Sequence, residues 1–138
     1  MTSRSQIESA IRALYEARVR GDVEGVVSFF TQNAVYRLHG AGTGSVALGR
    51  PAEGLAMIRL IVTALVQTSR FSNWKEIALL VDGEQAALHW RALATHGVTG
   101  KSVELDLFDF YKFRDGKILE LQQSFDTALA MSIAAKPV

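Results

Sequence analysis

Apolar residues recur at helical spacing in the first half of the chain and at strand spacing in the second half. An amphipathic helix is predicted from Ser5 to Arg20, because apolar positions repeat there about every 3.6 residues. Gly21 can end this helix, and Asp22 can cap a second, shorter one. The positions that repeat in the first helix are Ile7, Ile11, Leu14 and Arg18 or Val19.

A short strand and a third helix are predicted next. The stretch Ala34 to Leu38 alternates as a strand does, and Pro51 suits the first turn of the third helix. The buried stripe expected for that helix is Met57, Ile58, Ile61, Val62 and Leu65. Between strand and helix, the glycine-rich stretch Gly40–Ser45 lacks a following Gly-Lys-Ser/Thr, so we expect a mobile flap and not a phosphate loop.

Four strand-like runs separated by short turns make up the second half. They span Trp74–Val81, Gln85–Thr95, Ser102–Phe113 and Lys117–Phe125. Turn residues such as Asp115-Gly116 favour hairpins, so an antiparallel sheet is expected, followed by a short helix over about 127–134. Helices followed by antiparallel strands predict an α+β fold, and the 138 residues suit a single domain, 1–138.

At least two of these strands are apolar on both faces, Gln85–Thr95 and Ser102–Phe113. Alternation puts Leu105, Leu107 and Tyr111 on one side, with Phe108 and Phe110 on the other. One face can cover the helices, whereas the other needs a partner. The pattern therefore predicts a homodimer that forms through the sheet.

Composition excludes several classes of protein. The chain is 49% hydrophobic and 21% charged, which excludes disorder. Its 15 basic and 14 acidic residues give no clustered basic excess, so nucleic acid and membranes are not expected partners. The absence of cysteine excludes disulfides, thiolate zinc sites and iron–sulfur clusters. No stretch suits a signal peptide or a membrane span, so a cytoplasmic protein is expected.

Histidine spacing argues against a metal centre. His39, His89 and His96 form no i, i+4 pair on a predicted helix. We therefore expect neither a metal nor another cofactor.

Five short segments together resemble a known superfamily. They are Arg20–Gly25, Asn33–Tyr36, Gly49–Gly54, Phe113–Ile118 and Phe125-Asp126. In this order the chain resembles the nuclear-transport-factor-2-like superfamily, and within it the SnoaL-like and ketosteroid-isomerase-related proteins. The resemblance implies a cone-shaped, curved antiparallel sheet wrapped round the N-terminal helices, with a pocket inside the cone. It also implies that the protein is a dimer.

The catalytic positions of ketosteroid isomerases match this chain only in part. The resemblance places Leu14 where the isomerases have a tyrosine that binds the enolate, and Leu38 where they have the aspartate base. Tyr15 lies about 100° further round the predicted helix than Leu14. The second oxyanion donor of the family, a protonated aspartate, matches Asp109. True steroid isomerase activity is therefore not expected.

Two other relatives suggest further acid–base residues. In limonene-type epoxide hydrolases the matching positions are Tyr36 and Asp126, but the Arg-x-Asp position has Arg91 followed by Ala-Leu. In polyketide cyclases of this group an aspartate works with a histidine. Asp109 or Asp126 with His39 or His89 could imitate that pair.

Asp109 is the strongest candidate for chemistry. Its neighbours at 107, 108, 110 and 111 are apolar or aromatic, so burial should raise its pKa. The structural alternative is a carboxylate paired with Arg91 or with a backbone group at the sheet surface. Asp126 is the second catalytic candidate, and its structural alternative is a helix N-cap. The predicted substrate pocket consists of Tyr15, Phe30, Tyr36, Leu38, His39, Trp74, Trp90 and Tyr111.

Three functions fit these residues. The first is a cofactor-free isomerase, lyase or cyclase that acts by proton transfer on a small hydrophobic carbonyl compound. The second is a non-catalytic protein that binds a similar hydrophobic ligand. The third is an accessory or dimerisation domain whose cone is filled by its own side chains.

Overall fold

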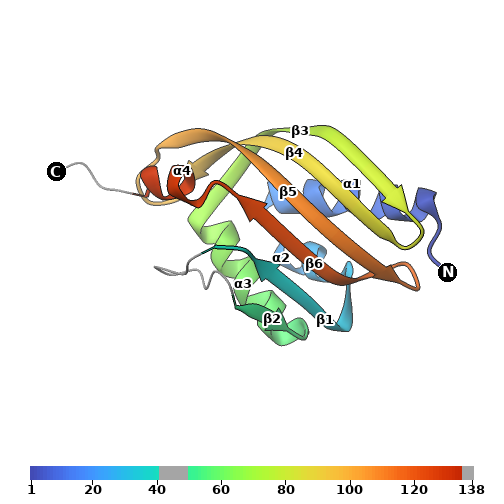
Figure 1. Cartoon of the computed structure of the whole chain (residues 1–138). Helices are drawn as coiled ribbons and strands as arrows, with labels where there is room; N and C mark the ends of the chain where they lie inside the picture. The colour runs from blue at the N-terminus through green and yellow to red at the C-terminus, as the bar shows by residue number, and fades with distance from the viewer. Residues whose placement is uncertain (41–49, 135–138) are drawn as a thin grey trace.

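The computed structural model describes residues 1–40 and 50–134, which form helices on one side of a six-stranded sheet (Figure 1). The helices are α1 (Arg4–Arg20), α2 (Val23–Val27), α3 (Leu55–Thr68) and α4 (Thr127–Ser132). The strands are β1 (Phe30–Leu38), β2 (Pro51–Glu53), β3 (Ser69–Asp82), β4 (Gln85–His96), β5 (Ser102–Arg114) and β6 (Lys117–Phe125). This is the α+β fold that the sequence predicts.

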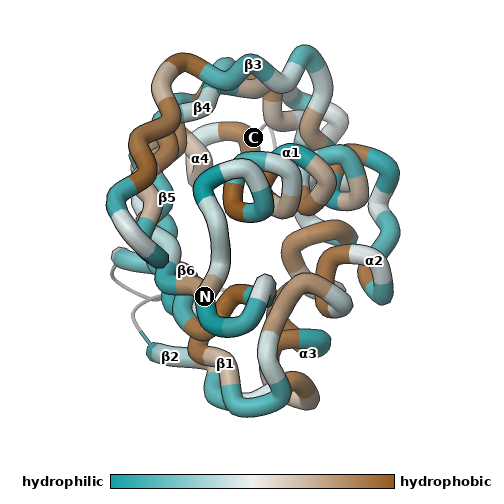
Figure 2. Tube along the Cα trace, turned by 90° about the vertical axis from the view of Figure 1, so that its right-hand side faces the viewer, coloured by the Kyte–Doolittle hydropathy of each residue, from teal (hydrophilic) through white to brown (hydrophobic). Residues whose placement is uncertain are grey.

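The sheet curves round the helices. Its strand order is β2-β1-β6-β5-β4-β3. Figure 2 shows it bending from β3 at the top, past β5, to β1 at the bottom, with α1, α2 and α3 on the concave side. All neighbouring strands are antiparallel except β1 and β6, which run parallel. The predicted cone is confirmed, with one parallel pair in a sheet expected to be antiparallel throughout.

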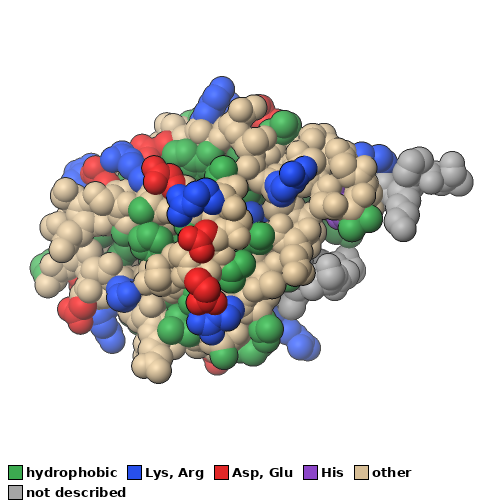
Figure 3. Space-filling model, turned by 180° about the vertical axis from the view of Figure 1, so that it is seen from behind, with side chains coloured by type: hydrophobic (Ala, Val, Ile, Leu, Met, Phe, Trp, Pro, Cys, Tyr) green, Lys and Arg blue, Asp and Glu red, His purple; other side chains and the backbone are tan. Residues whose placement is uncertain are grey.

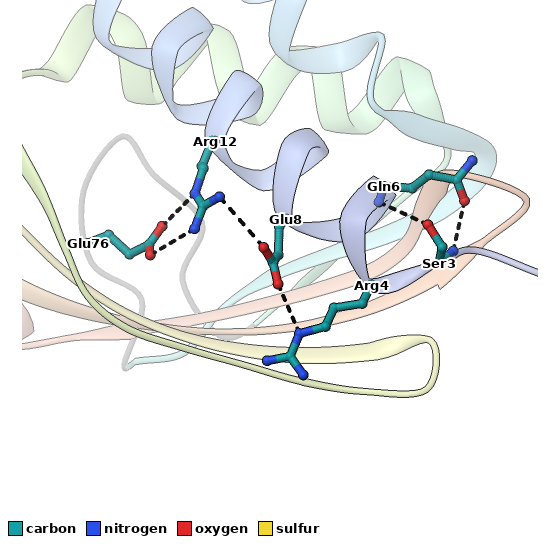
Figure 4. A network of polar contacts seen from close by, with 6 residues as sticks. All are labelled: Ser3, Arg4, Gln6, Glu8, Arg12 and Glu76. Atoms are coloured by element: carbon teal, nitrogen blue, oxygen red, sulfur yellow. Dashed lines mark hydrogen bonds and ion pairs between the residues drawn. The ribbon is translucent and has the colours of Figure 1, made fainter.

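Helix α1 begins and ends where the sequence indicates, to within one residue. Ser3 accepts a hydrogen bond from the backbone N–H of Gln6, whose side chain accepts one from the N–H of Ser3 (Figure 4). At the other end Gly21 adopts the left-handed conformation with φ 73°, and its N–H bonds back to the helix. Asp22 then caps α2 by accepting from the N–H of Gly25.

An ion-pair chain connects the exposed side of α1 to β3. Arg4 pairs with Glu8, Glu8 with Arg12, and Arg12 with Glu76 on β3 (Figure 4). Exposed pairs of this kind contribute little stability, because water and salt screen the charges. The helix is therefore held in place chiefly by its buried side.

The prediction that Pro51 lies in a helix is wrong. Residues Pro51–Glu53 form the edge strand β2, in which Ala52 pairs with Tyr36 of β1. Proline is tolerated at a sheet edge because its missing N–H is not needed there. Helix α3 begins only after Gly54, whose φ of 83° separates it from the strand.

Other boundaries and burial assignments also differ. Strand β1 begins four residues before the predicted start, at Phe30, and β3 begins at Ser69 directly after α3. Met57, expected in the buried stripe of α3, is exposed. Of the glycine-rich stretch predicted to be a flap, all but Gly40 lies outside the described residues.

The concave side of the sheet contains the core. Ile7 and Ile11 of α1, Ile58 of α3 and Ile118 of β6 are completely buried there. Seen from behind the view of Figure 1, on the side where the helices lie, the surface carries basic and acidic side chains interspersed (Figure 3). No helix in the described part of the chain is long and apolar enough to cross a membrane.

The convex face of the sheet exposes large apolar side chains. Leu80 is 69% exposed, Phe108 54% and Phe110 37%. Their strands are adjacent: Leu80 pairs with Ala87, which pairs with Phe110, and Phe108 pairs with His89. These residues form one apolar patch, which we call the outer patch.

We expect two copies of the chain to pair through the outer patch, because water contact with it is unfavourable and the same surface on a second copy can cover it. Static light scattering at micromolar concentration should give twice the 15.1 kDa of one chain. Phe108→Glu should lower the mass to that of one chain. Leu60→Glu, at an exposed leucine of α3, is the matched control and should remain dimeric. A wild-type mass of one chain would contradict this prediction.

Candidate functional site

Asp109 lies on the concave face of β5, near the middle of the molecule. The strand alternates strictly, so that Leu107, Asp109 and Tyr111 point inward while Phe108 and Phe110 point outward. Only 3% of Asp109 is exposed to solvent. The burial predicted from its apolar neighbours is therefore present.

Four side chains from four different elements donate hydrogen bonds to the Asp109 carboxyl. The hydroxyl of Tyr15 on α1 bonds to Oδ2. The Trp90 Nε1–H of β4 donates to Oδ2 at 2.9 Å, and the Tyr111 hydroxyl donates to it at 3.0 Å. The amide Nε2 of Gln123 on β6 donates to Oδ1 at 3.0 Å. We call these five residues the Asp109 cluster.

Further contacts fix the groups of the Asp109 cluster. The Tyr15 and Tyr111 hydroxyl oxygens are 2.6 Å apart. Tyr36 of β1 donates its hydroxyl proton to Oε1 of Gln123 at 3.0 Å. The Tyr15 ring stacks on Trp74, with centroids 5.6 Å apart, and lies 4.6 Å from Trp90. These contacts leave the buried hydroxyls and amide little freedom to turn.

Burial changes the acidity of this cluster. Loss of water raises the pKa of Asp109 to about 7, although hydrogen bonds from Gln123 and Tyr111 oppose the shift. Burial, reinforced by the nearby Asp109 charge, raises the pKa of the Tyr111 hydroxyl well above its usual value. Asp109 can therefore hold or release a proton near neutral pH, whereas Tyr111 stays protonated.

A cavity of about 240 Å³ lies between the sheet and the helices, and three residues of the Asp109 cluster form part of its wall. Tyr15, Trp90 and Gln123 line the cavity, and Asp109 lies behind them. Apolar side chains make up most of the remaining wall, including Leu14, Val26, Val62, Leu65, Phe71, Leu105, Leu107 and Leu121. Residues from α4 close one end, among them Ala130 and Met131.

The predicted pocket residues divide into two groups. Tyr15, Phe30, Tyr36 and Trp90 line this cavity. Leu38, His39, Trp74 and Tyr111 do not belong to its wall: Leu38 is completely buried core, and the imidazole Nε2 of His39 lies 2.7 Å from Oε1 of Gln122. Trp74 lies behind Tyr15, and Tyr111 touches the site through its hydroxyl.

The second catalytic candidate, Asp126, lies apart from Asp109. Its exposed side chain accepts a hydrogen bond from the N–H of Leu129 and caps α4. Asp126 is therefore the helix N-cap that was the structural alternative to a catalytic role. Its carboxylate lies outside the cavity wall.

The expected partners of Asp109 do not reach it. Arg91 points to the convex face and pairs with Asp106 at 2.9 Å, because these two residues are directly opposite in the β4–β5 register. His89 also bonds Asp106 and stacks on Phe108, so it cannot assist Asp109. Among residues 1–40 and 50–134, no group of three or more metal-ligating side chains lies close enough together to hold a metal ion.

Sequence reasoning missed several polar residues of the site. Gln123 and two cavity residues, Arg18 and His96, were not among the candidates. Tyr15 was predicted as a pocket residue but not as a partner of Asp109; its hydroxyl bonds to Oδ2 of Asp109, because the curved sheet reaches round α1. For Arg18 there was one indication of burial in the sequence: the helical repeat allowed either Arg18 or Val19 on the buried side of the predicted helix.

The sequence profile of the SnoaL-like domain matches residues 11–121, which is most of the chain. The chain belongs to the SnoaL-like domain family. No curated protein matches it.

Solved structures share the fold of this SnoaL-like chain. A candidate isomerase from Bacillus subtilis has a TM-score of 0.84 at 16% identity, covering 96% of this chain and 97% of that one. An NTF2-like protein from Burkholderia pseudomallei gives 0.81 at 19%, covering 95% and 98%. A candidate SnoaL-like polyketide cyclase from Jannaschia gives 0.79 at 16%, covering 96% and 94%. At these identities the likeness establishes the fold alone.

Asp109 should make the stability of this SnoaL-like domain depend on pH. Between the unfolded pKa of about 3.9 and the folded pKa of about 7, the folded state binds more protons than the unfolded state. The free energy of unfolding therefore falls as pH rises through that window. Relative to Asp109→Asn, the wild type should lose roughly 3 kcal/mol between pH 5 and pH 8.

Urea unfolding of both proteins at several pH values measures this difference. Asp126→Asn is the control, because an exposed capping carboxylate should not produce the same trend. A wild-type-minus-Asp109→Asn difference that stays constant between pH 5 and pH 8 would show that Asp109 has an ordinary pKa.

Proposed function

We propose that the protein is a cofactor-free enzyme that moves a proton on a small apolar carbonyl compound, with Tyr15 and Asp109 as the proton relay. The observation that carries this proposal is a buried carboxyl, bonded to a tyrosine hydroxyl in the wall of an apolar cavity. The pKa of about 7 for Asp109 suits acid–base catalysis near neutral pH, since the group can both take and return a proton.

The proposed step begins with Asp109 ionised. The Tyr15 oxygen accepts the proton from the carbon next to the ligand carbonyl, while the hydroxyl proton of Tyr15 passes to Oδ2 of Asp109. The electron pair of the broken C–H bond forms the C=C bond of an enolate, whose negative charge rests on the ligand oxygen. The reverse relay returns a proton to the same or another carbon, and Tyr15 and Asp109 regain their starting states.

The cavity limits the size of the ligand. An apolar cavity of about 150 Å³ can accept benzene, so the 240 Å³ here suits a compound of one or two rings. Leu14 and Leu38 supply no polar group, which is why a steroid isomerase reaction is not proposed. The names isomerase and polyketide cyclase among the structural neighbours are compatible with proton transfer next to a carbonyl.

A second candidate function is binding of a similar apolar ligand without catalysis. The observation that favours it is that Tyr15, Trp90, Tyr111 and Gln123 already use the hydrogen-bonding positions of the Asp109 carboxyl. In that case the Asp109 carboxyl would only keep the side chains of the cavity wall in position through these hydrogen bonds. The third candidate, a cone filled by its own side chains, is disfavoured by the volume of the cavity.

Proton transfer can be tested with 2-tetralone, a two-ring ketone with acidic C–H groups next to its carbonyl. In D₂O near pD 7 the protein should accelerate exchange of these protons for deuterium, followed by NMR. Tyr15→Phe should reduce the acceleration by about 10²–10⁴-fold, because the relay loses its only contact with the ligand. Asp109→Asn should cause a similar loss, because no group then accepts the Tyr15 proton.

Tyr36→Phe is the matched control. It removes a cavity hydroxyl that bonds Gln123 and does not touch Asp109, so most of the rate should remain. Exchange at the buffer rate, together with measurable binding of 2-tetralone, would favour the binding function. Full activity in Tyr15→Phe would refute the relay.

A further inference from the structure

Arg18 is a buried cation in the wall of a mainly apolar cavity. It is 8% exposed, whereas its neighbour Val19 is 41% exposed, so the buried stripe of α1 continues through position 18. Arg18 lines the cavity one helical turn beyond Tyr15, about 4.5 Å further along the helix axis. An arginine at such a position needs an explanation, because burying a charge is costly unless the charge is paired.

The contacts of Arg18 use only part of its guanidinium group. Nη2 donates to the backbone oxygens of Leu65 at 3.2 Å and Ser69 at 2.9 Å. The group lies over the Phe71 ring, with Cζ 4.5 Å from the ring centroid. Nε and Nη1 donate to no residue within the described ranges 1–40 and 50–134. These donors are available to a molecule in the cavity.

No counter-ion balances this charge in the described part of the chain. None of the described residues that line the cavity is an aspartate or a glutamate, and none of the ion pairs there involves Arg18. Burial lowers the pKa of Arg18 to about 10, which still leaves the group positively charged at neutral pH. The C-terminal end of α1 offsets the charge only in part.

His96 adds a second donor to the same region. It lines the cavity at the end of β4, directly opposite Ser69, whose backbone oxygen accepts from Arg18. Its Nδ1 accepts the N–H groups of Val98 and Thr99, both at 3.2 Å, so the proton of the neutral ring lies on Nε2. This end of the cavity therefore has donors and a positive charge but no carboxylate.

We infer that the ligand of this cavity is an apolar carboxylic acid, whose carboxylate pairs with Arg18 and can also accept from Nε2 of His96. The inference rests on the proposed function in one respect: if Tyr15 acts on a carbonyl group, the substrate is an apolar keto acid. A carboxylate would supply the missing counter-ion and the missing acceptors together, and charge-assisted hydrogen bonds of this kind are strong. A neutral ligand would leave the buried charge unpaired.

Two probes that differ in charge but hardly in shape test this inference. They are 4-phenylbutyrate and 4-phenylbutyramide, titrated into the protein by calorimetry at pH 6, where Asp109 is mostly protonated. Wild type should bind the acid at least about tenfold more tightly than the amide. Arg18→Met should remove that preference, and Arg18→Lys should retain part of it.

Arg20→Met is the matched control. Arg20 lies on the same helix and carries the same charge, but it is exposed and pairs with Asp22, so its loss should leave the preference intact. Should Arg18→Met fail to fold, the wild type and Arg18→Lys still decide the matter. Equal affinity of wild type for the two probes, binding of neither probe, or an undiminished preference in Arg18→Met would overturn the inference.

The inference and the proposed function can fail separately. Asp109→Asn should keep the preference for the acid, because Asp109 has no contact with Arg18. Loss of deuterium exchange with an intact preference would mean that the cavity binds acids without catalysis. Exchange without the preference would mean that the relay works on neutral ligands.

Discussion

The rest of the structure depends on providing hydrogen-bond partners for one carboxyl group that is buried away from water. A buried carboxyl is costly unless it is hydrogen-bonded, and Asp109 receives hydrogen bonds from Tyr15, Trp90, Tyr111 and Gln123. Because these side chains come from α1, β4, β5 and β6, satisfying one residue fixes the helix and three strands relative to one another. Three of these side chains, Tyr15, Trp90 and Gln123, also form part of the cavity wall, so its chemistry and its shape have a common origin.

Much of the fold could be predicted because its signals are local. The helical repeat, the stop at Gly21 and the cap at Asp22 placed α1 and α2, and turn residues placed the hairpins. The burial of Asp109 followed from its apolar neighbours on one strand. Pro51 misled because proline suits both a first helical turn and an edge strand, and only pairing with β1 distinguishes the two.

The site could be predicted only in part, because its partners are set by long-range geometry. Near the turn the β5–β6 register would put Asp109 opposite Gln122, but an extra residue near the start of β6, Leu119, shifts the pairing by one residue to Gln123. A shift of one residue exchanges the two faces of a strand. Tyr15 reaches Asp109 because the sheet curves round α1, and Arg18 lies in the cavity wall for the same reason.

The central claim is that Asp109 exchanges its proton near neutral pH inside the folded protein. Carbon-13 NMR of the aspartate carboxyl carbons, followed from pH 4 to pH 9, tests it most directly, with Asp109→Asn identifying the signal. The account predicts one aspartate that titrates with a pKa of about 7 while the fold stays intact. An Asp109 signal that titrates near the ordinary value of about 4 would contradict it.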